Sequence, residues 1–223
     1  MKPINVGLLG IGTVGSGAWD VLQRNASEIE RRAGRGIRIT HVADKDTKRA
    51  SAIVKKNAFV MSDAFSLVKN KNIDIVVELI GGTTIAKELV LEAIKHGKHV
   101  VTANKALLAT HGNEIFKAAQ KKGVMVAFEA SVAGGIPIIK ALREGLAANR
   151  IEWIAGIING TSNFILSEMR DKDLPFAAAL KDAQHKGYAE ADPTFDIEGV
   201  DAAHKLTILA ALAFGIPMQF PKA

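Results

Sequence analysis

The chain has 223 residues, of which 48% are hydrophobic and 23% charged, and a net charge of +6 at pH 7. This balance is typical of a folded globular protein and excludes an intrinsically disordered one. The absence of cysteine excludes disulfides, thiolate nucleophiles and cysteine-ligated metal centres. The longest uncharged stretch, Leu206 to Pro221, is broken by Gly215 and Pro217 and is too short to span a bilayer. Since no leader cleavage site is recognisable and the basic residues are scattered, we expect a cytoplasmic protein that binds neither membrane nor nucleic acid.

The first 130 residues alternate strand-like apolar runs with amphipathic helical patterns. Strands are predicted over Ile4–Leu9, Ile37–Ala43, Ile73–Leu79, His99–Thr102 and Val124–Phe128. Helices are predicted over Val14–Arg31, Asp46–Lys56, Ala86–His96 and Gly112–Gln120. Apolar runs separated by helices indicate a parallel sheet covered on both faces. We therefore predict a Rossmann-type, doubly wound α/β domain over residues 1–130.

Residues 131–223 follow a different pattern and are predicted to form a second domain. Helices are expected over Ile138–Leu146, Phe164–Arg170, Phe176–Lys186 and Val200–Phe214, with one strand over Ile151–Ile158. A single strand cannot form a sheet alone, because its backbone groups need a partner strand. We therefore expect an α+β domain that is partial or that borrows its strand pairing.

A glycine turn follows the first predicted strand directly. Gly10, Gly12 and Gly15 form the pattern G-x-G-x-x-G, which opens a helix here. In dinucleotide-binding folds these glycines allow a tight turn, close approach of the backbone to the pyrophosphate, and helix–strand packing. The first helical turn then presents free backbone N–H groups to the phosphates. We predict a dinucleotide site at these glycines and at Thr13 and Val14; a glycine turn without a ligand is the alternative.

The end of the second predicted strand carries the residue that would contact the adenosine ribose. An acidic residue here, Asp44, favours the ribose hydroxyls of NAD. The nearby cations Lys45, Lys48 and Arg49 favour the 2′-phosphate of NADP. The sequence therefore predicts a nicotinamide dinucleotide and leaves the choice between NAD and NADP open.

Lys105 follows a predicted sheet strand at its carboxyl end, where open α/β sheets bind their ligands. Asn104 is suited to cap the next helix, which places Lys105 in its first turn, against the helix dipole. A cation in this unfavourable position is a candidate acid or base. A surface lysine beside a helix cap is the alternative interpretation.

Asp201 and Lys205 lie four residues apart near the start of the last predicted helix and share one face. No charge follows from Leu206 to Pro221, which is typical of a buried helix. We therefore expect this charged pair, at the start of a buried helix, to line a cleft or an interface. A solvated ion pair is the alternative interpretation. The preceding loop, Gly187–Gly199, is rich in carboxylates.

These features together resemble homoserine dehydrogenase over essentially the whole chain. The resemblance is carried by Gly7–Gly17, Thr102–Ala109, Glu129–Pro137, Gly156–Asn163, Lys186–Pro193 and Asp196–Lys205. It implies interconversion of L-homoserine and L-aspartate 4-semialdehyde with NAD or NADP, in threonine and methionine biosynthesis.

The resemblance also implies a role for individual residues. Lys205 would be the general acid/base, with Lys105 as a second candidate beside nicotinamide and substrate. Glu190 and Asp201 would hold the substrate, and Gly187 would approach the nicotinamide. A sodium ion would bind at a site made of Glu129 and the backbone carbonyls of Val132, Gly134 and Ile136.

The family's substrate domain is longer than residues 131–223, so the resemblance predicts that this domain is truncated here. A full-length member would form a homodimer through the same domain. Two other functions stay open: a different Rossmann oxidoreductase acting on a small polar aldehyde, and a nucleotide-binding module without catalysis.

Overall fold

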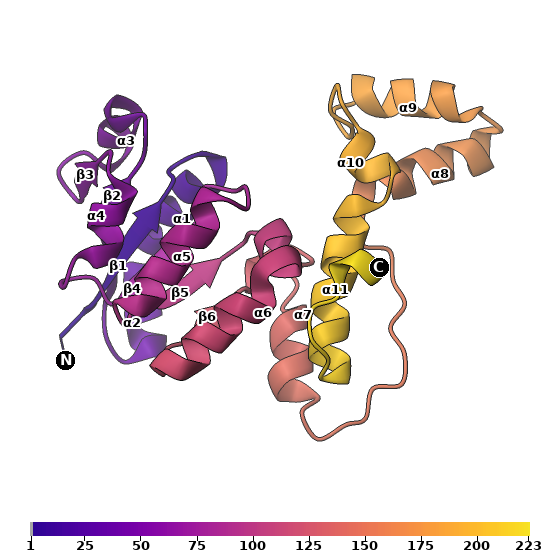
Figure 1. The fold of residues 1–223 in the computed structure, drawn as a ribbon. Coiled ribbons are helices and arrows are strands. Elements are labelled where there is room, and N and C mark those ends of the chain that lie inside the picture. The colour runs from indigo at the N-terminus through magenta and orange to yellow at the C-terminus, as the bar shows by residue number, and fades with distance from the viewer. Residues whose placement is uncertain (1) are drawn as a thin grey trace. The chain divides into compact units, whose positions relative to one another are not determined.

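The first strand-like run of the sequence forms the centre of a parallel sheet in a computed structural model, which describes residues 2–223 (Figure 1). The sheet order is β3-β2-β1-β4-β5-β6, and every neighbouring pair of strands is parallel. The strands are β1 (Ile4–Leu9), β2 (Ile37–Ala43), β3 (Phe59–Met61), β4 (Ile75–Glu78), β5 (His99–Thr102) and β6 (Val126–Ala127). This order confirms the predicted doubly wound fold.

The side chains of β1 alternate between the two faces of the sheet, and helices cover both faces. Val6 and Leu8 belong to a buried cluster with Trp19 of α1 and with residues of α3. On the opposite face, Gly7 leaves room for Leu67 of α4, since a methyl group at Gly7 would meet the Leu67 side chain. The helices of this unit are α1 (Thr13–Arg24), α2 (Ala26–Ala33), α3 (Thr47–Val54), α4 (Ala64–Lys69), α5 (Ile85–Lys95) and α6 (Lys105–Lys122).

Several element boundaries differ from the prediction. The helix predicted over Val14–Arg31 is two helices, because Asn25 leaves the helical conformation between them. The helix predicted to start at Gly112 starts at Lys105, where the Asn104 side chain caps it. The short elements β3 and α4 were not predicted.

The chain divides into two compact units, Met1–Gly135 and Ile136–Ala223. After the short 3-10 turn Glu129–Ser131 of the first unit, the second contains α7 (Ile138–Lys140), a π-helical turn (Ala141–Gly145), α8 (Gly160–Lys172), α9 (Phe176–His185), α10 (Thr194–Ile197), α11 (Val200–Phe214) and a 3-10 turn (Phe220–Lys222). The strand predicted over Ile151–Ile158 is absent. Across the described part of this unit there is no strand to pair with this segment, so it forms no regular secondary structure.

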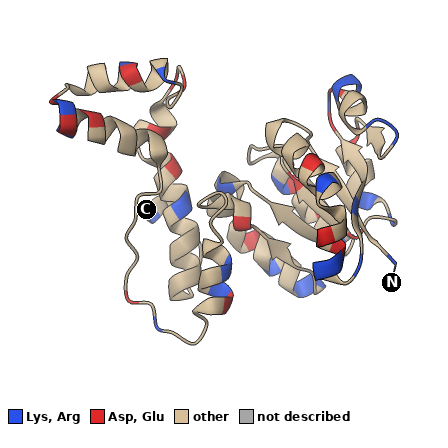
Figure 2. Ribbon diagram, turned by 180° about the vertical axis from the view of Figure 1, so that it is seen from behind, with Lys and Arg blue, Asp and Glu red and all other residues tan. Residues whose placement is uncertain are grey.

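A hairpin of helices forms one part of the second unit: α8 and α9 pack side by side (Figure 1). Ile165 of α8 is buried against Ala179 and Ala183 of α9. The last long helix, α11, carries no charge after Lys205 (Figure 2). Even so, within residues 2–223 no helix combines the length and apolarity needed to cross a bilayer.

The two tryptophans lie in different units and in opposite environments. Trp19 is 4% exposed and Trp153 is 74% exposed. We expect Trp19→Ala to lower the free energy of unfolding by about 3–5 kcal/mol, because it opens a cavity in the core of the first unit. Trp153→Ala, the matched control, changes this free energy by less than about 0.5 kcal/mol. Urea denaturation followed by circular dichroism measures both, and equal effects would contradict the burial assigned here.

Candidate functional site

At Gly10 and Gly15 the glycine turn is held by contacts that leave no room for side chains. Gly10 has a φ of +85°, and a methyl group at Gly15 would lie 2.2 Å from the Gly10 carbonyl oxygen. The Gly10 N–H donates to the Ala43 carbonyl at 2.9 Å, which joins the turn to the end of β2. At Gly12, in contrast, a methyl group would meet nothing within 4 Å. The turn is therefore tight on its inner side and open on the side where a dinucleotide would approach.

The amino end of α1 is suited to an anion. The helix begins at Thr13, no side chain caps it, and its first turn carries no acidic residue. Val14 in this turn is 62% exposed. The first N–H groups of a helix have no partner within the helix and attract phosphate oxygens. These residues fit a dinucleotide pyrophosphate.

Asp44 lies at the end of β2 and contacts the glycine turn. Its Oδ2 accepts a hydrogen bond from the Ile11 N–H at 2.8 Å, and its Oδ1 accepts from the Asp46 N–H at 2.9 Å. The carboxylate predicted to contact the ribose is thus half-buried and held beside the turn.

Lys105 is the first residue of α6 and is half-buried. Asn104 caps the helix, since its Oδ1 accepts from the Leu107 N–H at 3.0 Å. This confirms the predicted cap. Lys105 therefore lies at the carboxyl end of β5, in the same unit as the glycine turn.

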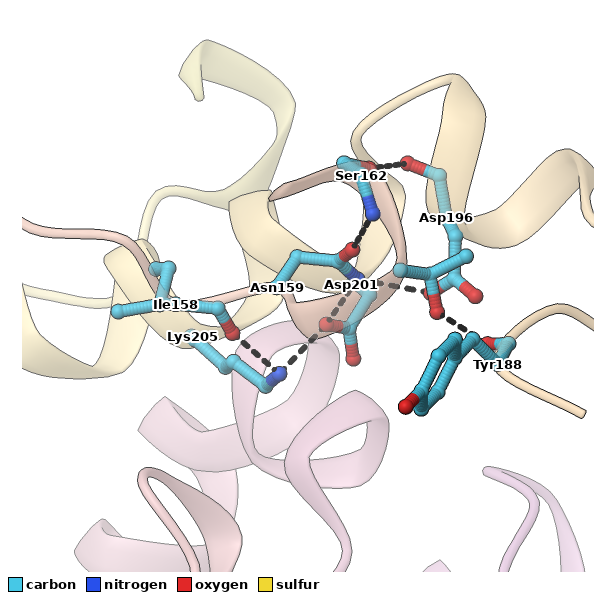
Figure 3. A network of polar contacts seen from close by, with 8 residues as sticks. Ile158, Asn159, Ser162, Tyr188, Asp196, Asp201 and Lys205 are labelled. Carbon is cyan, nitrogen blue, oxygen red and sulfur yellow. Dashed lines mark hydrogen bonds and ion pairs between the residues drawn. The ribbon is translucent and has the colours of Figure 1, made fainter. Parts of the chain in front are cut away.

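In the second unit, Lys205 and Asp201 form a buried ion pair (Figure 3). The Lys205 Nζ donates to Asp201 Oδ2 at 2.5 Å and to the Ile158 carbonyl at 2.7 Å. The side chains of Lys205 and Asp201 are 19% and 9% exposed. The pair is thus mostly shielded from water, which disfavours the alternative of a solvated ion pair. That it lines a cleft or an interface stays a prediction.

Asn159 joins two carboxylates in the same cluster (Figure 3). Its Nδ2 donates to Asp196 Oδ1 at 2.8 Å and to Asp201 Oδ2 at 2.9 Å. Its Oδ1 accepts from the Ser162 N–H at 2.7 Å and caps α8. Sequence reasoning did not single out Asn159 or Asp196 as site residues. The signals for Asn159 are its cap-forming residue type before a helix and its place in the segment Gly156–Asn163, which carries the resemblance.

The loop between α9 and α11 carries the other predicted substrate and cofactor contacts. Gly187 follows α9, has a φ of +76° and is exposed. Glu190 is exposed, and its carbonyl accepts from Gln184 at 3.1 Å. Hydrogen bonds from the Thr194 hydroxyl and backbone N–H hold the pKa of Asp192 below its usual range. The roles expected for Gly187 and Glu190 stay predictions.

We expect Asn159→Ala to lower the free energy of unfolding by about 2–3 kcal/mol, because it removes a helix cap and leaves two carboxylates without a shared donor. Ser162→Ala is the matched control. It keeps the capping N–H and removes only the hydroxyl bond to the Asp196 carbonyl, so we expect a loss of about 1 kcal/mol or less. Thermal and urea denaturation measure both, and equal losses would show that Asn159 does not organise the cluster.

Two family models match the chain. The model described as "Homoserine dehydrogenase, NAD binding domain" matches residues 10–129, and the model described as "Homoserine dehydrogenase" matches residues 137–223. The homoserine dehydrogenase of Pseudomonas aeruginosa is 64% identical over the whole chain, and that of Neisseria gonorrhoeae is 67% identical over 99% of it. The chain covers 51% and 50% of these relatives, and thus spans about half their length.

Solved structures agree with this assignment. A homoserine dehydrogenase from Thiobacillus denitrificans matches 99% of the chain at 68% identity with a TM-score of 0.93, and the chain covers 51% of it. A hyperthermophilic archaeal homoserine dehydrogenase in complex with NADPH matches 97% of the chain at 26% identity with a TM-score of 0.81, and the chain covers 71% of it. The chain belongs to the homoserine dehydrogenase family.

Proposed function

We propose that the protein interconverts L-homoserine and L-aspartate 4-semialdehyde with NAD or NADP. Family membership supports this activity. The observation that carries the proposal is the buried Lys205–Asp201 pair, because proton transfer to or from a substrate oxygen needs a positioned group shielded from water.

Lys205 moves the proton in this mechanism. The Lys205 ammonium, paired with Asp201, must first release one proton. In the direction of oxidation, the neutral amine then takes the hydroxyl proton of homoserine at Nζ, while the C–H bond of the carbon that bears the hydroxyl breaks and its C=O double bond forms. A nicotinamide dinucleotide held at the glycine turn Gly10–Gly15 would accept the hydride. In reverse, the Lys205 ammonium returns the proton to the oxygen of the aldehyde carbon. Proton and hydride thus leave or enter together, and the charge balances.

Asp201 orients Lys205 and supplies negative charge for the substrate. Its Oδ2 accepts from both Lys205 and Asn159, so the lysine is held on two sides, by this carboxylate and by the Ile158 carbonyl. Those two bonds use two of the three donors of an ammonium and leave the third for a substrate oxygen. Glu190, together with Asp201, would bind the substrate ammonium, and Lys105 would be a second acid/base.

The first unit would hold the cofactor by its backbone. The open space at Gly12 and the uncapped end of α1 suit a pyrophosphate, and Asp44 suits an adenosine ribose. A relative in complex with NADPH supports a nicotinamide dinucleotide here. Since Asp44 and the cations Lys45, Lys48 and Arg49 favour different cofactors, we propose both.

A monovalent cation would bind near the end of the first unit. Glu129 begins a 3-10 turn, and Ala133 and Gly134 then adopt φ values of +61° and +56°. This irregular backbone leaves the carbonyls of Val132 and Gly134 outside regular elements, and with the Glu129 carboxylate they would supply the hard oxygen donors that sodium prefers. The Ile136 carbonyl would be a further ligand of the cation.

We also propose that the full-length protein assembles as a homodimer.

The proposed reaction predicts that Lys205→Ala lowers the rate of NAD(P)⁺ reduction by L-homoserine by about 10²–10⁴-fold, the contribution of a general acid/base. Absorbance at the reduced-nicotinamide band measures this rate. Lys172→Ala is the matched control, since Lys172 also pairs with a carboxylate four residues away but is half-exposed on α8. We expect it to leave turnover unchanged.

Turnover that survives Lys205→Ala would contradict this mechanism. A chain that binds NAD(P)H without oxidising L-homoserine would instead support a nucleotide-binding module. Turnover with another small polar aldehyde in place of the semialdehyde would support a different oxidoreductase.

The carboxylate of Asp44 should disfavour the 2′-phosphate of NADP. We expect Asp44→Asn to raise the ratio of NADPH to NADH affinity about tenfold, because the change removes one repulsive charge and keeps an oxygen for the Ile11 N–H. Fluorescence titration with both cofactors measures the ratio. An unchanged ratio would show that Asp44 does not face the ribose.

The proposed cation predicts a higher melting temperature in NaCl than in choline chloride at equal ionic strength. We expect a rise of about 2–4 °C, because a ligand that binds only the folded state stabilises it. Glu129→Gln should abolish most of the difference. If the two salts give the same melting temperature for the unaltered chain, the cation proposal is wrong.

A further inference from the structure

Glu78 is a buried carboxylate that the proposed reaction does not use. It is the last residue of β4 and is 0% exposed. Burying a carboxylate costs much free energy unless hydrogen-bond donors surround it. A carboxylate at this place therefore needs a structural explanation.

Three donors surround Glu78, and they come from two different segments. Its Oε1 accepts from the backbone N–H groups of Ile80 and Gly81 at 3.0 and 3.1 Å. Its Oε2 accepts from the Thr102 hydroxyl at 2.5 Å. Glu78 and Thr102 are partners in the β4–β5 register, each at the carboxyl end of its strand. The carboxylate thus joins the loop after β4 to the end of β5.

The contacts continue to the start of α6 and return to the same loop. The Thr102 hydroxyl oxygen accepts from the Asn104 N–H at 3.0 Å. The Asn104 Nδ2 then donates to the Gly82 carbonyl at 2.6 Å. The loop Ile80–Gly82 is therefore held from both ends, and the same bonds fix the residue that precedes Lys105.

This closed set of hydrogen bonds lies where the second half of a dinucleotide would bind. In sheets of this order the dinucleotide crosses the carboxyl edge between β1 and β4. The protein carboxylate that binds its adenosine ribose lies at the end of β2. Asp44 at the end of β2 marks the adenosine side. The strands β4 and β5 then belong to the nicotinamide side. A methyl group at Gly10 would lie 2.9 Å from the Ile80 side chain, so the loop after β4 packs directly against the glycine turn.

We propose that Glu78 is a positioning residue for the nicotinamide half of the cofactor, acting through the loop Ile80–Gly82 and through Thr102 and Asn104. The inference rests on the proposed cofactor binding and adds to it a residue that touches neither cofactor nor substrate. Because the loop and the start of α6 are fixed before binding, less conformational freedom is lost when the nicotinamide ribose arrives.

The test compares whole-cofactor binding with adenosine-side binding. Calorimetric titration of the 223-residue chain with NADPH, or with NADH if that binds more tightly, measures the first, and titration with ADP measures the second. We expect Thr102→Val and Glu78→Gln to lower the affinity for the reduced dinucleotide about tenfold, which is the scale of one lost buried hydrogen bond. The affinity for ADP should stay unchanged. Thr102→Ser keeps the hydroxyl and should bind as the unaltered chain does.

Unchanged binding of the reduced dinucleotide in Thr102→Val would overturn the inference, as would an equal loss for ADP, which would indicate a general structural defect. Thr102→Val is nearly isosteric and decides the question if Glu78→Gln does not fold. Failure of the unaltered chain to bind NADPH, NADH or ADP would refute the proposed cofactor site itself, and that result is distinct from a failure confined to the variants.

Discussion

The parallel direction of all six strands is the constraint on which the first unit depends. Parallel strands end at the same edge of a sheet, because each crossover returns the chain to the opposite edge before the next strand starts. Groups far apart in the sequence therefore meet at one edge. The glycine turn follows β1, Asp44 follows β2, Glu78 ends β4, and Lys105 follows β5. The positions of these groups therefore depend first on the direction of the strands and only then on the individual side chains.

Electrostatics organise the second unit in another way. A buried lysine–carboxylate pair pays a desolvation cost that its mutual attraction offsets only when further hydrogen bonds complete the geometry. Here the Ile158 carbonyl and the Asn159 amide supply those bonds. Asn159 also caps α8, so the same side chain that stabilises the start of one helix fixes the charge on another. The local fold and the placement of Lys205 are thus stabilised by the same contacts.

Local sequence spacing predicted those features that depend on neighbours along the chain. The long apolar strands, the Asn104 cap and the Asp201–Lys205 pair all follow from patterns within a few residues. The strand β3 was missed because it has only three residues and exposes Phe59. The strand predicted over Ile151–Ile158 was wrong for the opposite reason. Its residues favour a strand, but a strand forms only where another can pair with it.

The buried hydrogen-bond clusters could not be predicted from spacing. Asn159 contacts carboxylates 37 and 42 residues away, and Glu78 contacts a hydroxyl 24 residues away. Such bonds depend on which strand ends and helix ends meet, and that is fixed by the tertiary fold. Nothing in the local sequence therefore distinguishes a lone buried acid such as Glu78 from the other residues of its apolar strand.

The two units would divide the proposed reaction between them. The first unit would bind its ligand mainly through backbone N–H groups and glycine contacts, which side-chain changes alter only indirectly. The second would move a proton through one side chain, Lys205, whose position depends on Asp201 and Asn159. Affinity for the dinucleotide should thus depend on the shape of a loop edge, whereas turnover should depend on the placement of a charge. Although Glu78 is a carboxylate, it would affect dinucleotide affinity and not turnover, because it shapes a loop and does not exchange a proton with the substrate.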